Sequence, residues 1–284
     1  MACVLGDANF SSVVLLCHFN GANGGTSTVD SSSFARTVTQ VGSQCALSTA
    51  HAAFGATSST TGSTTGNRWA CADSSDWQFS GAFVVECSIY LTQTPGANKI
   101  VAQAGANGNE SWYFGFNDAT HLTFKYSTSG AWPMSEVAGA WTPSLNAWHA
   151  VCAERDASNA LRVYADGAVI AGPTTVSGTF FNSTATLQIA GDDGNLFNSF
   201  TSGFLDELRI TKGVSRYGGT YTPAVAAFPD TALNAGCAKG SFHSPFGERV
   251  GFPSPTLLAA LAPLVLGRAI ERNRVTTRRG LLRP

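Results

Sequence analysis

A chain of 284 residues with 12% charged residues and 30 glycines is typical of a turn-rich β protein, and it excludes a helical bundle or a disordered chain. The net charge of −1 hides two unlike parts. Residues 1–232 carry 9 Lys and Arg against 16 Asp and Glu, a net −7, and residues 233–284 carry 8 against 2, a net +6. We therefore expect an acidic folded part and a basic C-terminal arm with different tasks.

The first residues and the cysteines bear on the compartment. Residues 1–10 show no basic stretch followed by an apolar one, so we expect no secretory signal. The seven cysteines are an odd number and show no C-x-x-C spacing. Cys17, Cys87 and Cys152 fall inside expected strands, where a thiol packs as a small apolar residue. We expect most cysteines to be reduced, as in a protein made in a cytoplasm.

Short apolar or alternating stretches, separated by turn residues, run through the first 230 residues. The clearest is 83–91, where every second residue from Phe83 to Leu91 is apolar, and it predicts a half-buried strand. Residues 27–35 are expected to form a polar loop. The other expected strands are 13–19, 37–41, 44–47, one strand within the Ser/Thr/Gly-rich stretch 54–66, then 68–71, 100–104, 112–116, 121–126, 148–155, 161–166, 186–190 and 204–210. This pattern, without a convincing helix, predicts an all-β fold, a two-sheet antiparallel jelly-roll sandwich.

A carboxylate pair, Asp206-Glu207, interrupts the apolar stretch 203–210, G-F-L-D-E-L-R-I. Burying two carboxylates costs several kcal/mol unless cations or hydrogen-bond donors meet them. Three partners remain open from the residues alone, namely Arg209, backbone N–H groups and a bound cation.

Four stretches carry a resemblance to a known family. Residues 203–217, G-F-L-D-E-L-R-I-T-K-G-V-S-R-Y, and 15–21, L-L-C-H-F-N-G, are similar to the closing and opening strands of concanavalin A-like, laminin-G-type jelly-roll domains of phage and bacterial surface proteins. W-H-A-V at 148–151 with L-R-V-Y-A-D-G at 161–167 resembles the hairpin of that family, and L-Q-I-A-G at 187–191 its penultimate strand. The resemblance implies a jelly roll but leaves the task open, since this fold hosts lectins, hydrolases and scaffolds.

The resemblance also suggests domain boundaries. We expect a lead-in of residues 1–12, a concanavalin A-like jelly-roll domain of residues 13–230, and an irregular basic C-terminal arm of residues 231–284.

A metal site is a further implication of the resemblance. In many such domains an aspartate of the last strand binds a structural Ca²⁺ together with backbone carbonyls near the end of the first strand. The matching positions here are Asp206 and Asn20, and Asn20 stands where the family often has Asp, which removes a ligand charge. We expect either Ca²⁺ at this place or an Asp206 held by hydrogen bonds or by Arg209.

Catalytic patterns are missing from the sequence. Glycoside hydrolysis needs two carboxylates at a fixed separation, and the E-x-D-x-x-E arrangement of glucanases with this fold does not occur. The sequence has no G-x-S-x-G and no P-loop, and its five histidines are scattered. We therefore expect no enzymatic activity, and a polysaccharide-degrading enzyme is the disfavoured alternative.

Two tryptophans are candidates for binding carbohydrate. Trp132 in S-G-A-W-P and Trp141 in G-A-W-T-P lie in turn-rich stretches. A sugar-binding face combines an aromatic platform with fixed polar groups, and exposed loop tryptophans suit that role. The alternative is that both rings only cap the edge of the sandwich.

The arm joins an apolar segment to a basic one. Residues 256–267, T-L-L-A-A-L-A-P-L-V-L-G, are too short to span a bilayer, and arginines follow them. We expect the arm to dock on another protein rather than to lie on a membrane surface or to bind nucleic acid. The expected docking residues are Leu257, Leu258, Leu261, Leu264, Arg268, Arg272, Arg274, Arg278 and Arg279.

Together these observations predict a phage virion protein of the decoration, tail or fibre kind, structural or adhesive, made in the host cytoplasm. Its expected partners are other virion proteins and its own copies in a homo-oligomer. The alternative is a carbohydrate-binding module that recognises host cell-surface glycans.

Overall fold

A computed structural model describes residues 6–61, 64, 66–106, 108–191, 203–233, 242–243 and 249–250. The chain divides into two compact units, Gly6–Ala232 and a second that joins Met1–Leu5 to Leu233–Pro284. In the second unit β17 (Phe242–His243) pairs with β18 (Arg249–Val250). The predicted docking residues between 257 and 279 lie outside the described residues, so that prediction stays open.

The first unit is built from two antiparallel sheets of eight strands each, with two short 3₁₀ turns, η1 (Phe10–Ser12) and η2 (Ser75–Trp77). The first sheet has the order β14-β13-β12-β7-β16-β5-β4, with β1 also paired to β16. Its strands are β1 (Val13–Cys17), β4 (Leu47–Ser48), β5 (Ser58–Thr60), β7 (Phe83–Leu91), β12 (Trp148–Arg155), β13 (Ala160–Ala165), β14 (Ala168–Thr175) and β16 (Gly203–Lys212).

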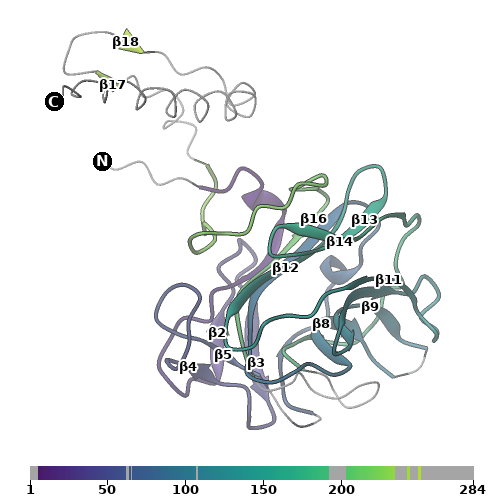
Figure 1. Cartoon of the computed structure of the whole chain (residues 1–284), viewed down its shortest axis with the longest axis horizontal. Coiled ribbons are helices and arrows are strands. Elements are labelled where there is room, and N and C mark those ends of the chain that lie inside the picture. Colours follow the sequence, from purple (N-terminus) through teal and green to yellow (C-terminus); the bar gives the residue numbers. More distant parts are fainter. Residues whose placement is uncertain are drawn as a thin grey trace, which may run out of the picture. The chain divides into compact units, whose positions relative to one another are not determined.

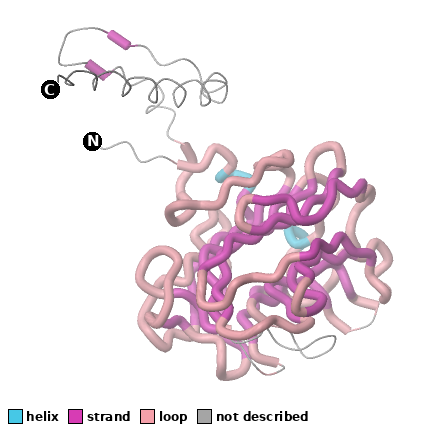
Figure 2. The backbone as a smooth tube through the Cα atoms, in the orientation of Figure 1, coloured by secondary structure: helices cyan, strands magenta, loops and turns pink. Residues whose placement is uncertain are grey.

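The second sheet has the order β11-β10-β9-β8-β15-β6-β3-β2. Figure 1 shows β8, β9 and β11 of this sheet grouped apart from β13, β14 and β16 of the first sheet, and Figure 2 shows long loops joining the strands. Its strands are β2 (Ser27–Val29), β3 (Thr37–Val41), β6 (Arg68–Cys71), β8 (Asn98–Ala104), β9 (Glu110–Asp118), β10 (His121–Tyr126), β11 (Ser135–Ala140) and β15 (Leu187–Ile189).

The predicted all-β jelly-roll sandwich is confirmed, and the strands that the sequence did not indicate share one property. β2, β11 and β14 all lie at sheet edges. Residues 27–29 alternate exposed, buried and exposed, and β14 has no buried residue, so neither carries an apolar pattern. Edge strands need less burial than central ones, and polar edges also discourage pairing with other chains.

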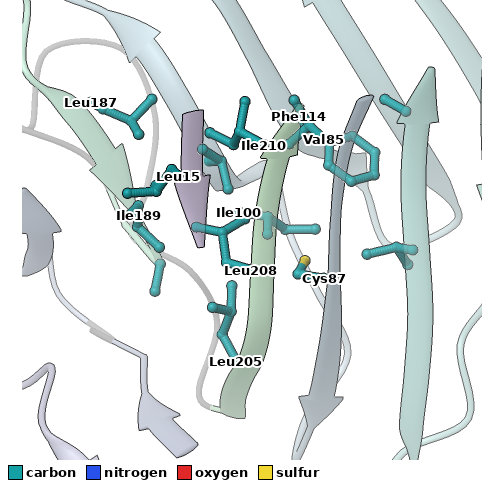
Figure 3. Close-up of a cluster of buried hydrophobic side chains, with 14 of the residues drawn as sticks. Leu15, Val85, Cys87, Ile100, Phe114, Leu187, Ile189, Leu205, Leu208 and Ile210 are labelled. Carbon is teal, nitrogen blue, oxygen red and sulfur yellow. The ribbon is translucent and has the colours of Figure 1, made fainter. Parts of the chain in front are cut away.

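The core lies between the sheets. Figure 3 shows Leu15, Val85, Cys87 and Ile210 of the first sheet gathered with side chains of the second sheet in one cluster. The expected inner face of 83–91 is confirmed, since its five apolar residues are at most 3% exposed. Among the described residues all five cysteines are buried free thiols, namely Cys17, Cys45, Cys71, Cys87 and Cys152.

Because residues 83–91 were expected to be buried on one face only, the outer face of β7 was expected to be exposed, and for Val84 and Glu86 this is wrong, because both are fully buried. A segment that we call the strap, residues 213–232, packs over this part of the first sheet. Tyr221 of the strap joins Val84, Cys152 and Tyr164 in a second apolar cluster. The strap therefore gives the first sheet a cover on its outer side.

β16 occupies the centre of the first sheet and has different neighbours along its length. β7 pairs with one edge of it, while the other edge pairs first with β5, at residues 204–205, and then with β1, at residues 208–211. Between the residues paired with β5 and those paired with β1, the register of β16 against β7 shifts at residues 206–209. Glu207, within this bulge, adopts a φ of 51°. Such a left-handed conformation is unfavourable for a residue with a side chain. The carboxylate pair thus sits at the irregular point where one partner strand ends and the next begins.

Candidate functional site

Asp206 holds a loop of the first unit through backbone N–H groups. Its Oδ2 atom accepts hydrogen bonds from Ala53 (2.8 Å) and Phe54 (3.2 Å), and its Oδ1 atom accepts one from the N–H of Glu207 (2.9 Å). Burial raises the pKa of Asp206 to about 7, although the hydrogen bonds from Phe54 and Ala53 work in the opposite direction. The carboxylate is therefore an anchor for the residues that lead into β5.

The predicted calcium ligands do not fit a calcium ion as they are placed. Ca²⁺ takes about six to eight oxygen ligands, but the Asp206 oxygens face N–H groups, and Asn20 Oδ1 accepts from the N–H of Ala56 (3.2 Å). Those N–H dipoles present their positive ends, which repel a cation. Across the described residues, no group of three or more His, Cys, Asp or Glu side chains is arranged to hold a metal ion. The calcium site stays a prediction that this geometry does not favour.

Glu207 connects the end of β1 to the strap. Its Oε1 lies 2.8 Å from His18 Nδ1, and its Oε2 accepts from the N–H of Phe228 (2.8 Å). Burial alone would lower the pKa of His18, but the hydrogen bond and charge of Glu207 outweigh it and raise that pKa. The pair is a structural tie between segments far apart in the sequence.

Arg209 does not neutralise Asp206, so that alternative is wrong. Its guanidinium pairs with Glu86 (2.8 Å) and with Asp7 (3.1 Å), and Arg216 of the strap also pairs with Asp7 (2.8 Å). The side chains of these four residues are at most 8% exposed. The bulge after Asp206 pairs Arg209 in register with Glu86, so these two side chains lie next to each other on one face of the sheet.

His149 lies between a carboxylate and a serine, an arrangement that invites comparison with a catalytic triad. Its Nδ1 is 2.7 Å from Asp166 Oδ2, and its Nε2 is 3.0 Å from Ser144 Oγ and 2.9 Å from the Ser144 carbonyl oxygen. The hydrogen bond with Asp166, opposed by burial and helped by the Ser144 carbonyl, raises the pKa of His149. Because Nε2 lies as close to the Ser144 carbonyl oxygen as to the Ser144 hydroxyl, a ring that donates to this carbonyl has no Nε2 lone pair with which to activate Ser144.

The two predicted carbohydrate-binding tryptophans differ in their surroundings. Trp141 is partly buried, stacks on Phe116 with ring centroids 6.0 Å apart, and meets His149 edge-on at 5.2 Å. Trp132 is 43% exposed, on the loop between β10 and β11. Trp141 thus packs as part of the sandwich, whereas Trp132 presents an aromatic surface to solvent.

Lys125 lies beside Trp132, and a chain of contacts continues from it across three neighbouring strands to Glu136 and Asn117. Lys125 Nζ on β10 is 5.6 Å from the centroid of the Trp132 ring and 3.2 Å from Glu136 Oε2 on β11. Asn117 Nδ2 on β9 donates to the same Oε2 atom (2.7 Å). We call Asn117, Lys125, Trp132 and Glu136 the Trp132 strip. The ring and the fixed polar groups lie on one surface, which is the combination that binding of a sugar requires.

The electrostatics of the strip are fixed by its own contacts. The hydrogen bond from Asn117, opposed by burial and helped by Lys125, lowers the pKa of Glu136, so that this carboxyl stays ionised. The ammonium of Lys125 also lies 5.7 Å from the buried Tyr113 ring. It is therefore held between two aromatic rings and a carboxylate, as cation–π contacts favour.

A second aromatic group lies on the outer face of the first sheet. Phe204, Tyr90 and Trp148 are paired in register across β16, β7 and β12, and His51 stacks on Tyr90 at 4.2 Å. The rings of the three strand residues meet edge to face, with interplanar angles of 60° and 77°. Each ring is half-buried against its neighbours, so we assign this group to stabilisation of the sheet.

The sequence indicated Trp132 but not its polar neighbours. A signal was present in the alternation of residues 121–126, H-L-T-F-K-Y, which places Lys125 on the face opposite the buried Phe124. Glu136 was missed because β11 is an edge strand without an apolar pattern. Its pairing with β10 places Glu136 directly opposite Lys125.

Residues 62–215, just over half of the chain, match the family model of the concanavalin A-like lectin/glucanases superfamily. No curated protein matches the chain. In the described part of the chain no helix has the length and apolar character needed to cross a membrane.

Solved structures with the same fold include three binding domains or complexes. Domain 4 of AbnA, a GH43 extracellular arabinanase from Geobacillus stearothermophilus, in complex with arabinotriose, is 16% identical with a TM-score of 0.51, and the match covers 72% of this chain and 94% of that one. The binding domain of Paraclostridial Mosquitocidal Protein 1 is 13% identical with a TM-score of 0.52, covering 73% and 50%.

Botulinum neurotoxin type C, whose cell entry depends on interaction with two ganglioside molecules, is 14% identical with a TM-score of 0.51, covering 72% and 48%. This chain thus spans about half the length of the two toxin structures. At these identities the likeness shows the fold.

Proposed function

This chain belongs to the concanavalin A-like lectin/glucanases superfamily. We propose that it is a glycan-binding domain of this superfamily without catalytic activity. The observation that carries the proposal is the exposed Trp132 ring beside the fixed polar groups of Lys125, Glu136 and Asn117. The apolar face of a sugar ring packs on an aromatic ring, while hydroxyl groups exchange hydrogen bonds with such polar groups. Likeness to a domain in complex with arabinotriose and to a ganglioside-dependent toxin supports this class of ligand.

The chemistry of the strip supports binding rather than hydrolysis. A glycosidase needs a second carboxyl group, and one of the two acts as a general acid with a raised pKa. Within the Trp132 strip Glu136 is the one carboxyl group, and the hydrogen bond from Asn117 and the charge of Lys125 lower its pKa. His149 Nε2 lies 2.9 Å from the Ser144 carbonyl oxygen, and an imidazole that donates to this oxygen does not serve as a general base for Ser144 either.

A glycan microarray probed with the full-length chain tests the proposal. We expect binding to a defined set of glycans, and Trp132→Ala should weaken it about tenfold or more, since an aromatic contact contributes about 0.5–1.5 kcal/mol beyond its area. Leu145→Ala is the matched control, because Leu145 is a loop residue that is 41% exposed and lies outside the strip. Equal binding by the wild type and Trp132→Ala would contradict the proposal.

We further propose that this domain is displayed on a phage virion, with other virion proteins and its own copies as partners. The similarity of residues 203–217 to the closing strand of phage jelly-roll domains supports this, as do the five described thiols, which are buried and unpaired as in proteins from a reducing compartment. Mass spectrometry of purified particles is the test. Particles that lack this chain would overturn the virion role and leave glycan binding untouched.

A further inference from the structure

We infer that the Trp132 strip selects neutral glycans and rejects those with a carboxylate, such as sialylated or uronic-acid-containing chains. This inference rests on the proposed glycan binding and names the ligand class for the same surface. Its basis is the uneven exposure of the two charges in the strip.

The negative charge of the strip is the accessible one. The side chain of Glu136 is 44% exposed, whereas that of Lys125 is 15% exposed. Lys125 is also occupied by Glu136 and by the rings of Trp132 and Tyr113. The charge that is more accessible to a ligand at the strip is therefore the carboxylate of Glu136.

One further cation is near the strip, because the Lys99 ammonium lies 5.9 Å from the Tyr113 ring centroid, but Lys99 is fully buried. Residues 127–134, S-T-S-G-A-W-P-M, which connect β10 to β11, contain no charged residue. At the turn between β9 and β10, Asp118 is 54% exposed and is paired with His121. Residues 1–232 as a whole carry a net −7. A ligand carboxylate at the strip would thus meet the exposed carboxylate of Glu136, and like charges at short range are an effective means of rejecting a ligand.

The same groups suit a neutral polyhydroxylated ligand. An ionised carboxylate has about four lone-pair sites and accepts hydrogen bonds only. Asn117 and Lys125 both donate to Glu136 Oε2, and they fix the orientation of the carboxylate beside the Trp132 ring. Neighbouring hydroxyl groups of a sugar ring stacked on Trp132 can donate to this acceptor without bringing a charge.

Matched pairs of glycans test the inference with the full-length chain. The probes are N-acetyllactosamine with and without terminal sialic acid, and xylotriose with and without a glucuronic acid side group, within a wider array of such pairs. We expect every pair that binds through Trp132 to favour the neutral member about tenfold or more. Glu136→Gln keeps the shape of the side chain but removes its charge, and it should bring the two members of a pair to within about threefold.

A second variant tests whether the rejection of anionic glycans depends on the charge of Glu136 or on any disturbance of the strip. Lys125→Met keeps the side-chain stem but removes the ammonium, and it should leave anionic glycans rejected. Anionic members that bind as well as neutral ones, with binding lost in Trp132→Ala, would overturn the selection and leave the proposed function standing. Binding that persists in Trp132→Ala, or no binding across the whole array, would overturn both.

Discussion

The outer face of the first sheet and the Trp132 strip on the second sheet are built from similar residues in different surroundings. Under the strap, Glu154 is fully buried and accepts hydrogen bonds from Ser215, Tyr164 and the backbone N–H groups of residues 216–218. On the strip, Glu136 accepts from Lys125 and Asn117 and is 44% exposed. One carboxylate thus has its acceptor sites filled by the protein, and the other keeps access to a ligand.

This difference shows that burial beneath another segment, rather than residue type, distinguishes a structural ion cluster from a binding surface. Arg209 and Lys125 are both cations beside carboxylates and aromatic rings, since Arg209 also lies 3.7 Å from the centroid of the Phe228 ring. The strap removes Arg209 from water, so the buried carboxylates of Glu86 and Asp7 rely on Arg209 for their compensating charge. Trp132, in contrast, keeps 43% of its surface exposed.

The largest expected effect is that of removing the buried cation. Arg209→Ala leaves the carboxylates of Glu86 and Asp7 buried with fewer partners, and it should lower the free energy of unfolding by about 3–5 kcal/mol. Lys125→Ala on the strip should lower it by less than about 1 kcal/mol, because the pair with Glu136 is partly exposed. Urea unfolding of both variants measures the difference. Similar losses in the two variants would break the comparison.

A smaller loss is expected at the loop anchor. Asp206→Ala leaves the N–H groups of Ala53, Phe54 and Glu207 without their acceptor, which should cost about 1–3 kcal/mol. Glu136→Ala is the matched carboxylate on the strip and should change stability by no more than about 0.5 kcal/mol. Thermal unfolding of the two variants checks this. An Asp206→Ala variant as stable as Glu136→Ala would mean that the loop does not depend on this anchor.

The sequence predicted the sandwich and most central strands, because period-2 apolar alternation reports directly which face meets the core. It did not predict that Val84 and Glu86 are buried on the other face, since their cover comes from the strap more than a hundred residues later in the chain. Local patterns carry no information on such distant contacts.

For the candidate site the sequence indicated the aromatic residues, but it did not indicate which of them is exposed. Turn-rich surroundings indicated Trp132 and Trp141 alike, and only packing against Phe116 and His149 separates the buried ring from the exposed one. The predicted partner of Asp206 could not be chosen from sequence either. Arg209 is close in the chain, but the bulge at residues 206–209 pairs it in register with Glu86, and its guanidinium contacts that carboxylate.

An intermediate case is expected for His149, whose side chain is 10% exposed while that of Asp166 is 45% exposed. Because the pKa of His149 in the folded protein lies above its ordinary value of 6.5, folding favours the protonated ring. The pair should contribute about 1 kcal/mol below pH 6.5, and this contribution should be lost as the pH rises through the raised pKa.

Urea unfolding of the wild type and His149→Gln over this pH range measures that contribution. The difference between the two proteins isolates His149, since His18 titrates in both. A difference that grows toward alkaline pH would show that the ring is held neutral and would reopen the question of a base beside Ser144.

The smallest expected effect is that of calcium on the melting temperature. It tests whether the Asp206 carboxylate holds the residues that lead into β5 without a metal ion. Asp206 and Asn20 direct their oxygens to the N–H groups of Ala53, Phe54 and Ala56, and burial raises the pKa of Asp206 to about 7, whereas a metal ligand has to be ionised. We expect the melting temperature of the wild type to be the same in EDTA and in millimolar Ca²⁺. A bound ion present at about 100 times its Kd would stabilise the fold by about 2.7 kcal/mol, which thermal unfolding readily detects. Asp206→Ala measured under both conditions is the control. If Ca²⁺ stabilised the wild type but not this variant, the ion would be bound at Asp206, and the N–H groups would not be the partners of this carboxylate.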